Sequence, residues 1–497
     1  MDRRVAQGRS QPPHDDLQPP STLVAIGVGL ALVAIALVVY TISHPFRYYD
    51  HFEWQALAFL EGKAAIRFPV EGSGGSPGNA FFQDVLPVAT TDGVSRGVIP
   101  FPPLPAVVLM PFVALWGLAA DGQLVFAVLG AIDVGLAWWV LGRLPIRPWV
   151  RIAATIFFAF GTVFWYAAQI GTTWYQAHVL AVGLALAAIG VAVGHDPNAA
   201  RDEDDILDDD VLHDGVLDGP EGLPRRRLDA RRLVPDPHQL LAGFLFGLAC
   251  TSRLTVVFAA PFFVLVGSGG SWQRRGLSAA IGAAIPIGLL VAYNLVTTGH
   301  LLHPGYEYLY RLEAGFYTPL HYNLAWAIED PRYLPQNFAI MFLNTPVLAP
   351  TVVPSALGTG GPLCTAPDAV RGLFNPDCPL LLPRDTGMSI LLTSPAYLLA
   401  LPAIRRGYGH SRLVTGATLA VLLVAFVNLM HFSQGWVQFG YRFSNDFVPW
   451  ALLLVAIGLE WIARRGLRGW VVPAVVLIVA SVAINLWGVA WADVLGW

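Results

Sequence analysis

Apolar segments long enough to cross a bilayer recur along this chain and constrain its fold more than any other feature. The first of them, residues 22–42, holds 21 consecutive residues without a charge. A helix needs about 20 apolar residues to cross the hydrocarbon core of a membrane. Over all 497 residues, 55% are hydrophobic and only 13% are charged, which excludes an ordinary soluble domain. The sequence therefore predicts an all-α polytopic membrane protein.

The charged residues indicate where the protein works. A net charge of -4 gives no sign of nucleic-acid binding, so no nucleic-acid partner is expected. Lys63 is the single lysine among 30 basic residues, and alanine, glycine and proline are abundant. This bias is typical of a GC-rich bacterial genome and favours the bacterial plasma membrane. No small-residue cleavage site follows the first apolar run, so we expect it to be an uncleaved anchor.

Nine segments have the length and composition of membrane helices, and two others are ambiguous. The nine are residues 22–42, 122–142, 149–168, 173–194, 277–297, 388–404, 411–431, 443–463 and 469–491. Residues 100–117 are short and proline-rich, so they form either a span or a helix at the membrane interface. Residues 239–267 hold Arg253 at their middle and form either one span or a tight hairpin.

Arginines in the loops favour one solution, because short cytoplasmic loops carry the excess of basic residues. An interfacial helix at 100–117 and a hairpin at 239–267 place every arginine-rich loop on the same side as Arg3, Arg4 and Arg9. The expected topology then has eleven membrane helices, with the N-terminus inside and the C-terminus outside. Arg253 falls at an outer turn, which avoids the cost of about 2.5–3.5 kcal/mol for a charge at the centre of a lone helix.

This topology divides the chain into six parts. They are a disordered cytoplasmic tail (1–21), an N-terminal membrane module (22–194) with a first outer loop (43–121), a charged cytoplasmic linker (195–238), a set of membrane helices (239–297), a second outer loop (298–387) and the C-terminal membrane helices (388–497). The linker contains "RDEDDILDDD" and lacks the glycine and terminal glutamate of a calcium loop, so it is predicted to be disordered and solvated. Cys364 and Cys378 fit a disulfide outside the cell, with two unpaired thiols as the alternative.

Ionisable residues gather at the predicted outer ends of the helices, whereas the inner ends hold mainly arginines. The outer set includes Asp50, His51, Glu53, Asp84, His178, Arg253, His300, His303, Arg442 and Asp446. Arg442 precedes the start of a predicted helix, where backbone N–H groups and a guanidinium together favour an anion. An arginine can neutralise a phosphate leaving group, and a carboxylate can take a proton from an attacking hydroxyl. Glycosyl transfer from a polyprenyl phosphate uses these groups.

Four motifs follow one another in a recognisable order. Asp50-His51 precedes "QALAFLEG" after the first helix, and "FPPLPAVVLMPFVALWG" opens a second segment at the outer surface. Later come "GLACTSRLTVVFAAP" around Arg253 and "GYRFSNDFVP" around Arg442. The ordered set covers nearly all of the chain. It resembles the GT-C superfamily of membrane glycosyltransferases, particularly the protein O-mannosyltransferase and lipid A aminoarabinose transferase branch.

The resemblance implies roles for individual residues. It makes Asp50 the catalytic base and makes Arg253 and Arg442 contacts to the donor phosphate. His51 stands where the family has a second acid. Possible contacts to substrate, or to a divalent cation as cofactor, are His51, Glu53, Asp84, His178 and His303. The residues themselves leave other roles open: Asp50 as a carboxylate that anchors its helix at the interface, and Arg442 as the i,i+4 partner of Asp446.

The expected function is an inverting transfer of a hexosyl or pentosyl group from a polyprenyl-phosphate donor. The acceptor would be a protein, lipid or glycan outside the cytoplasm, and the active site would face outward among membrane lipids. Two other classes remain open. A transporter or flippase for a lipid-linked sugar also needs intramembrane charges, and a noncatalytic subunit would keep this fold without activity.

Overall fold

The structure is a computed structural model, and it describes residues 22–42, 49–67, 84–89, 91, 94, 96–196, 234–313, 323, 325–355, 358–435, 437–465 and 468–497. The N-terminal half contains α1 (Thr22–Thr41), α2 (His51–Leu60), α3 (Leu104–Trp116), α4 (Gly122–Leu141), α5 (Pro148–Phe160), α6 (Phe164–Ile170) and α7 (Thr173–Gly194). The cytoplasmic tail and the acidic part of the linker lie outside the described residues.

The C-terminal half is also mainly helical. Its helices are α9 (Pro237–Cys250), α10 (Pro261–Leu265), α11 (Trp272–Thr298), α12 (Gly305–Glu313), α13 (Leu334–Phe342), α14 (Ile390–Thr393), α15 (Ala400–Gly407), α16 (Arg412–Met430), α17 (Val448–Arg464) and α18 (Arg468–Leu495). Short 3-10 helices include η5 (Leu254–Ala259), η8 (Pro395–Leu399) and η9 (Arg442–Asp446).

Six helices in the described part of the chain are long and apolar enough to cross a membrane: α1, α4, α7, α11, α16 and α18. The pair α5 and α6, bent by 51° between them, makes a seventh if the two count as one broken span. Each of these coincides with a predicted span. The count of eleven and the sidedness of the membrane stay predictions, because length and composition alone test neither.

One predicted span, residues 388–404, is not a continuous helix. It consists of α14, η8 and α15, and the first break falls at Ser394 and Pro395. Proline supplies no backbone N–H and disfavours a helical conformation in the residue before it. Ser394 accordingly adopts φ -138° and ψ 66°, outside the helical region. The segment is apolar, as predicted, but Pro395 prevents it from forming one continuous helix.

The ambiguous segment 239–267 folds as a hairpin. Helix α9 ends at Cys250, and η5 and α10 bring the chain back. At the base of the hairpin, Nε2 of Gln239 donates to the carbonyl oxygens of Phe263 (2.6 Å) and Val266 (3.2 Å). The chain therefore reverses within this segment, with Arg253 at the turn as predicted.

The other ambiguous segment, residues 100–117, contains α3, a short helix of 13 residues that packs against α2.

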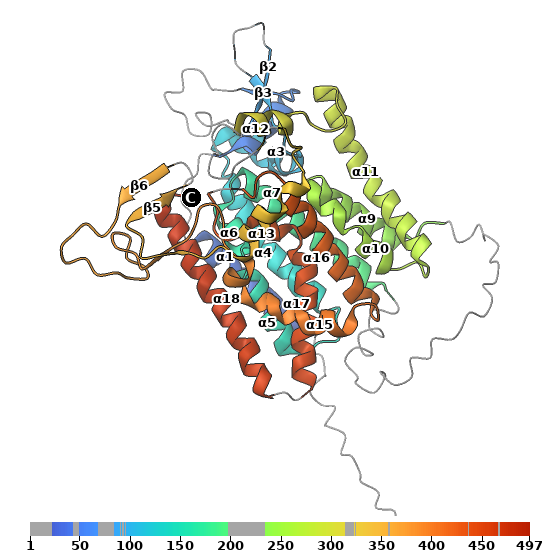
Figure 1. The fold of residues 1–497 in the computed structure, drawn as a ribbon. Coiled ribbons are helices and arrows are strands. Elements are labelled where there is room, and N and C mark those ends of the chain that lie inside the picture. The colour runs from blue at the N-terminus through green and yellow to red at the C-terminus, as the bar shows by residue number, and fades with distance from the viewer. Residues whose placement is uncertain are drawn as a thin grey trace, which may run out of the picture.

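The bundle has two chemically different ends (Figure 1). At one end α5 meets α17, where Oε1 of Glu460 accepts from Nε of Arg464 at 3.0 Å and Oε2 accepts from the backbone N–H of Arg147 at 2.9 Å. At the other end, the first residues of α7 and α17 meet the last residues of α9 and α16, beneath α3 and α12. A small antiparallel sheet of order β1–β3–β2 (Ile66–Arg67, Arg96–Val98, Leu86–Val88) also lies at this second end.

The segment predicted as the second outer loop contains two strand pairs. Strand β4 (Val347–Leu348) pairs with β7 (Leu381–Leu382), and β5 (Val352–Ser355) pairs with β6 (Gly358–Pro362), both antiparallel. Figure 1 shows one of these pairs, β5 and β6, beside the end of α18. Cys364 and Cys378 are joined by the predicted disulfide. The loop is therefore a folded structure.

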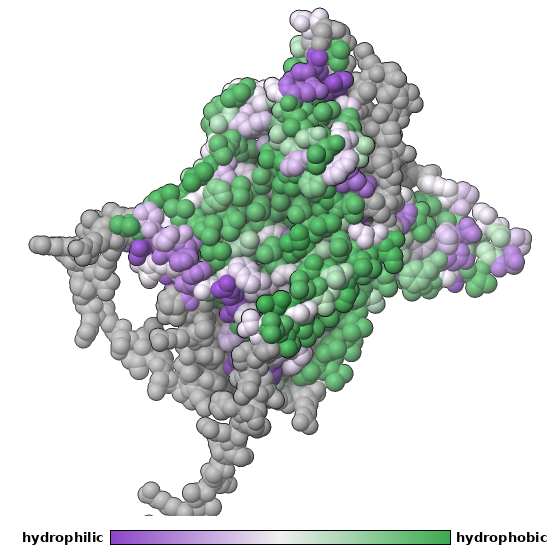
Figure 2. Space-filling model, turned by 180° about the vertical axis from the view of Figure 1, so that it is seen from behind, coloured by the Kyte–Doolittle hydropathy of each residue, from purple (hydrophilic) through white to green (hydrophobic). Residues whose placement is uncertain are grey.

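The core runs through the middle of the bundle, and α17 lies at its centre with 14 of its 17 residues buried. Gly458 on α17 faces the backbone of Leu399, so closely that a Cβ there would overlap the Leu399 carbonyl oxygen. Glycine thus lets α17 approach η8. The outer surfaces of α1, α11 and α18 are exposed and apolar, and Figure 2 shows a broad apolar surface over the bundle. A bundle that exposes apolar side chains this widely is suited to lipid rather than water.

Candidate functional site

A cavity of about 110 Å³ lies at the second end of the bundle, where helix ends and the two outer loops meet. Its lining comes from six separated segments of the chain, and its polar members include Asp84, Thr173, Ser252, Arg253, Tyr306, His431 and Arg442. Three of the residues predicted for the site, Asp84, Arg253 and Arg442, therefore share one cavity.

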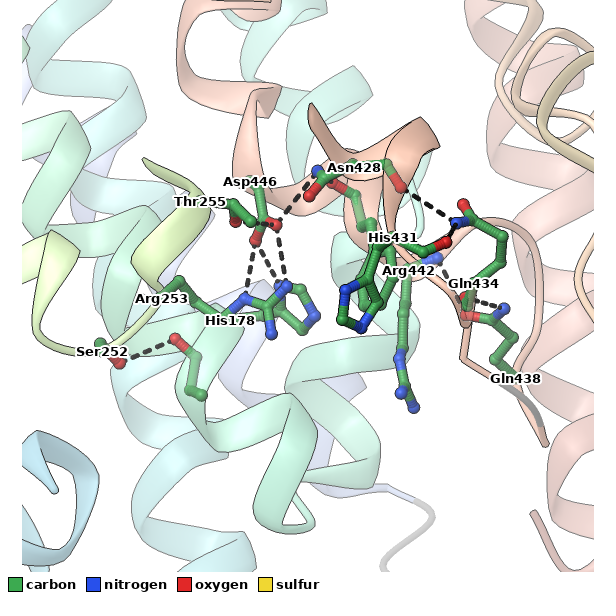
Figure 3. A network of polar contacts seen from close by, with 12 residues as sticks. His178, Ser252, Arg253, Thr255, Asn428, His431, Gln434, Gln438, Arg442 and Asp446 are labelled. Atoms are coloured by element: carbon green, nitrogen blue, oxygen red, sulfur yellow. Dashed lines mark hydrogen bonds and ion pairs between the residues drawn. The ribbon is translucent and has the colours of Figure 1, made fainter. Parts of the chain in front are cut away.

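Behind one wall of this cavity lies a buried carboxylate with several partners, Asp446. Its two oxygens accept from Nε and Nη2 of Arg253 at 3.0 and 2.9 Å. They also accept from the Thr255 hydroxyl at 2.7 Å and from the Asn428 amide at 3.2 Å, and Nδ1 of His178 lies 2.9 Å away. Figure 3 shows these partners arriving from different helices. The bidentate contact fixes the plane and direction of the Arg253 guanidinium.

Local structure explains why Asp446 meets Arg253 and not Arg442. Residues Arg442–Asp446 form the 3-10 helix η9, which turns every three residues, so side chains four apart do not share a face. Arg253 lies in the turn after α9 with an extended backbone, φ -136° and ψ 108°, which carries its side chain toward η9. The i,i+4 pair between Arg442 and Asp446, open in the sequence, does not form.

Arg442 lies in a different environment from Arg253. Its guanidinium carbon is 5.4 to 6.0 Å from the ring centres of Trp174, Tyr175 and Phe443, within the range in which an aromatic face attracts a cation. In the part of the chain that the structure describes, it forms no ion pair, and its buried Nε has no hydrogen-bond partner. In Figure 3 its guanidinium points away from the Asp446 network. Arg442 thus brings to the cavity a positive charge that is not held in an ion pair within the described chain.

Asp84 is the acid that lines the cavity. Its Oδ2 accepts a hydrogen bond of 2.8 Å from the indole N–H of Trp174. Burial raises the pKa of the Asp84 carboxyl to about 6, although the Trp174 hydrogen bond and the charge of Arg442 act in the opposite direction. Near neutral pH this carboxyl is thus ionised but close to the pH at which it takes up a proton.

Asp50, the predicted catalytic base, is not among the residues that line the cavity. The ring of its neighbour Tyr49 packs against Trp174 in a tilted arrangement, with ring centres 4.8 Å apart. The Tyr49 carbonyl oxygen accepts from the backbone N–H and the hydroxyl of Thr173 at 3.2 and 2.8 Å. Because Thr173 and Trp174 form part of the wall, Asp50 lies one layer of residues behind it. The structure therefore brings the two arginines together with Asp84 and places Asp50 elsewhere.

Asp50 is grouped with Glu53, one turn further along α2. Oε1 of Glu53 accepts from the Gln176 amide at 3.2 Å, and a Cβ at Gly122 would overlap the same oxygen. Oδ1 of Asp50 and Oε2 of Glu53 are buried without a hydrogen-bond partner among the described residues. Burial raises the pKa of Asp50 to about 7, and burial together with the charge of Asp50 raises the pKa of Glu53 to about 8. This pair holds protons near neutral pH.

The three histidines that were predicted as substrate or metal contacts each contact a different residue. His178 faces Asp446, Nδ1 of His51 lies 3.0 Å from the Thr173 hydroxyl, and Nδ1 of His303 accepts from the backbone N–H of Gly305 at 3.0 Å. Burial lowers the pKa of His51 to about 3 and that of His303 to about 4. Among the described residues no group of three or more histidine, cysteine, aspartate or glutamate side chains is placed to hold a metal ion. A divalent cation as cofactor stays a prediction, and the reaction proposed for this cavity uses none.

Comparisons with known proteins do not identify a function for this chain. No protein-family model matches the chain, and no curated protein matches it. Among solved structures, the chain is similar to the apo crystal structure of the Archaeoglobus fulgidus oligosaccharyltransferase, with a TM-score of 0.42 and 11% identity. The match covers 95% of this chain and 56% of that one, so the chain spans little more than half the length of that protein. A likeness this low carries no argument about the site.

Proposed function

We propose that the protein is a membrane glycosyltransferase of the GT-C kind, which moves a sugar from a polyprenyl-phosphate donor to an acceptor at the membrane surface. The observation that carries the proposal is Arg442, which has no ion pair among the described residues, beside the oriented Arg253 in one cavity with an acid. This cavity lies at the end of an apolar bundle, where we expect a lipid headgroup to reach. The ordered motifs around Asp50, Arg253 and Arg442 support the same function.

In the proposed reaction, the donor phosphate binds at Arg442 and against the exposed edge of Arg253. An acceptor oxygen forms a bond to the anomeric carbon of the sugar while the bond from that carbon to the phosphate oxygen breaks. The bonding electron pair leaves with the phosphate, where Arg442 offsets the developing negative charge. The acceptor hydroxyl gives its proton to a carboxylate. Direct displacement on the face opposite the phosphate would invert the anomeric centre.

Two carboxylates are candidates for the proton acceptor. Asp50 has this role by resemblance to the family, and Asp84 has it by position, because Asp84 lines the cavity. Both have raised pKa values, as a general base that works near neutral pH requires. We assign the role to Asp84 in the described arrangement. Asp50 is the alternative, and its use would require Trp174 to move aside.

The test is a transfer assay in proteoliposomes with a panel of polyprenyl-phosphate sugars and a mixed set of acceptors. The Arg442→Gln variant is expected to lose transfer by about 10²–10³-fold, the loss typical of removing one charge-stabilising donor. Asp84→Asn and Asp50→Asn then identify the base, whose removal is expected to cost about 10²–10⁴-fold. Asp368→Asn, an exposed acid in the second outer loop, is the control.

Three outcomes would contradict the proposal. Movement of the lipid-linked sugar across the bilayer without transfer would identify a flippase. Donor binding without transfer or movement would identify a noncatalytic subunit. Full transfer by the Arg442→Gln variant would show that the cavity does not bind the phosphate.

A further inference from the structure

The loop closed by the disulfide Cys364–Cys378 carries apolar side chains on its outside. Val370, Leu373 and Phe374 are exposed by 78%, 45% and 57%. All three lie within five residues of one another in the turn that the disulfide closes. Apolar residues grouped in this way on an outer loop call for a partner surface.

The loop is held so that these side chains cannot fold inward. Besides the disulfide, the Gly372 backbone N–H donates to the Cys378 carbonyl oxygen at 3.0 Å. Nη1 of Arg371 donates to the carbonyl oxygens of Pro350 and Pro379 at 3.1 and 2.9 Å. The side chain of Arg371, the one arginine of the loop, therefore binds backbone carbonyl oxygens, whereas the apolar side chains of Val370 and Leu373 remain exposed.

A direct contact fixes the level of the loop along the bundle. The indole N–H of Trp491 on α18 donates to the Leu373 carbonyl oxygen at 3.0 Å. Trp491 lies about one turn before the end of α18, and exposed apolar side chains occur on α18 both before it (Leu486, 50%) and after it (Val494, 57%). The apolar outer surface of this candidate membrane span thus extends past the point at which the loop is attached.

The loop packs directly against the end of α18. Trp491, which donates to the loop, is only 3% exposed, so this side of the helix end faces protein, whereas Leu486 and Val494 on the same helix remain exposed. Strands β5 and β6, which precede Cys364 in the chain, project sideways from the bundle beside the end of α18 (Figure 1).

We propose that the disulfide-closed loop inserts Val370, Leu373 and Phe374 into the lipid leaflet that surrounds the end of α18. Continuity with the exposed apolar surface of α18 identifies lipid as the occupant. The loop also continues toward the cavity, because the Asp385 carbonyl oxygen accepts from the Gln438 N–H at 3.1 Å and Oε1 of Gln438 accepts from the Arg442 N–H at 3.1 Å. Insertion would hold the segment before Arg442 at a fixed depth. The proposal does not depend on the chemistry of the cavity.

The test uses the full chain in lipid vesicles with a nitroxide label at Phe374→Cys. Cys250 is buried and the other two cysteines are bonded, so the introduced thiol is the reactive one. The matched control is Asp368→Cys, an exposed polar position on the same loop. The label at 374 is expected to collide severalfold more with oxygen, which dissolves in lipid, than with a water-soluble nickel chelate. The label at 368 is expected to show the reverse ratio.

Equal collision ratios at 374 and 368 would overturn the proposal. Protection of the 374 label from both reagents, with crosslinking between two copies at this position, would also overturn it, because protein would then cover the loop. A second measurement replaces the nitroxide with a fluorophore at 374. Quenching by brominated lipid is expected, and loss of that quenching after substitution of both loop cysteines by serine would show that the disulfide holds the side chains in lipid.

Discussion

Two groups of buried carboxylates lie at the same end of the bundle and are stabilised in opposite ways. Asp446 has a bidentate arginine, a hydroxyl, an amide and a histidine around it. At the other group, Gln176 donates a hydrogen bond to Glu53, and one oxygen each of Asp50 and Glu53 is buried without a hydrogen-bond partner in the described chain. Burial disfavours a charged carboxylate in both places.

The difference shows what each group is suited to do. Partner cations and donors offset the cost of burial at Asp446, so this group acts as a fixed counterion that positions Arg253. At Asp50 and Glu53 burial raises the pKa of both carboxyls, so the protein retains protons there instead. A carboxylate that keeps one protonation state can hold its neighbouring side chains in a fixed arrangement. A carboxyl group that titrates near neutral pH can exchange a proton with a substrate.

The largest effect is expected for Asp446→Asn. This change keeps the shape of the side chain but leaves Arg253 buried without its counterion, and breaking such a pair costs about 3–5 kcal/mol. The free energy of unfolding of the purified protein in detergent, from denaturant titration, measures the loss. Asp368→Asn is the control. A change below about 0.5 kcal/mol in Asp446→Asn would mean that the network does not support the fold.

The next effect is expected at Gly122, at the start of α4. An alanine there would overlap Oε1 of Glu53, and forcing a methyl group into a packed site costs about 1–3 kcal/mol. Gly27→Ala on α1 is the matched control, because a Cβ at that glycine meets no atom within 4 Å. The double variant Gly122→Ala with Glu53→Ala should recover most of the loss. Simple additivity of the two changes would show that the two residues do not touch.

A smaller and pH-dependent effect is expected for Glu53→Gln. Because the folded protein holds a proton on Glu53 up to a pKa of about 8, the wild-type protein loses stability as pH rises from the unfolded value near 4.5 toward 8. The amide has no such proton to lose. We expect Glu53→Gln to gain stability over wild type as the pH rises from 5 to 8. Thermal unfolding at both pH values checks the sign, and a benefit larger at pH 5 would contradict it.

The sequence predicted the features that are set locally. The bounds of α1, α4 and α7 agree with the predicted spans to within one residue, because an uninterrupted apolar run determines a membrane helix. The turn at Arg253 followed from the placement of charge. Asp50, predicted from its motif, was expected to share a site with the two arginines.

The contacts that define the cavity could not be predicted in the same way. Arg253 and Asp446 lie 193 positions apart, and Trp174 and Asp84 lie 90 apart. No local pattern indicates which helix ends will meet, so Asp446 was identified only as a possible partner of Arg442. The position of Asp50 behind Trp174 also depends on how α2 packs against α7, which hydropathy does not determine.

The smallest effect is expected at Trp174, which lies between Asp84 in the cavity and the residue next to Asp50. Its ring packs at a tilt against Tyr49, and its indole N–H donates to Asp84. Trp174→Phe keeps an aromatic wall and removes one hydrogen bond, so a loss of about 1 kcal/mol in stability is expected. The hydrogen bond also lowers the pKa of Asp84, so its removal should raise that pKa and shift the acidic limb of the transfer rate toward higher pH. An unshifted pH profile in Trp174→Phe, with Asp84→Asn fully active, would move the role of base to Asp50, because that carboxyl has no hydrogen bond from this indole.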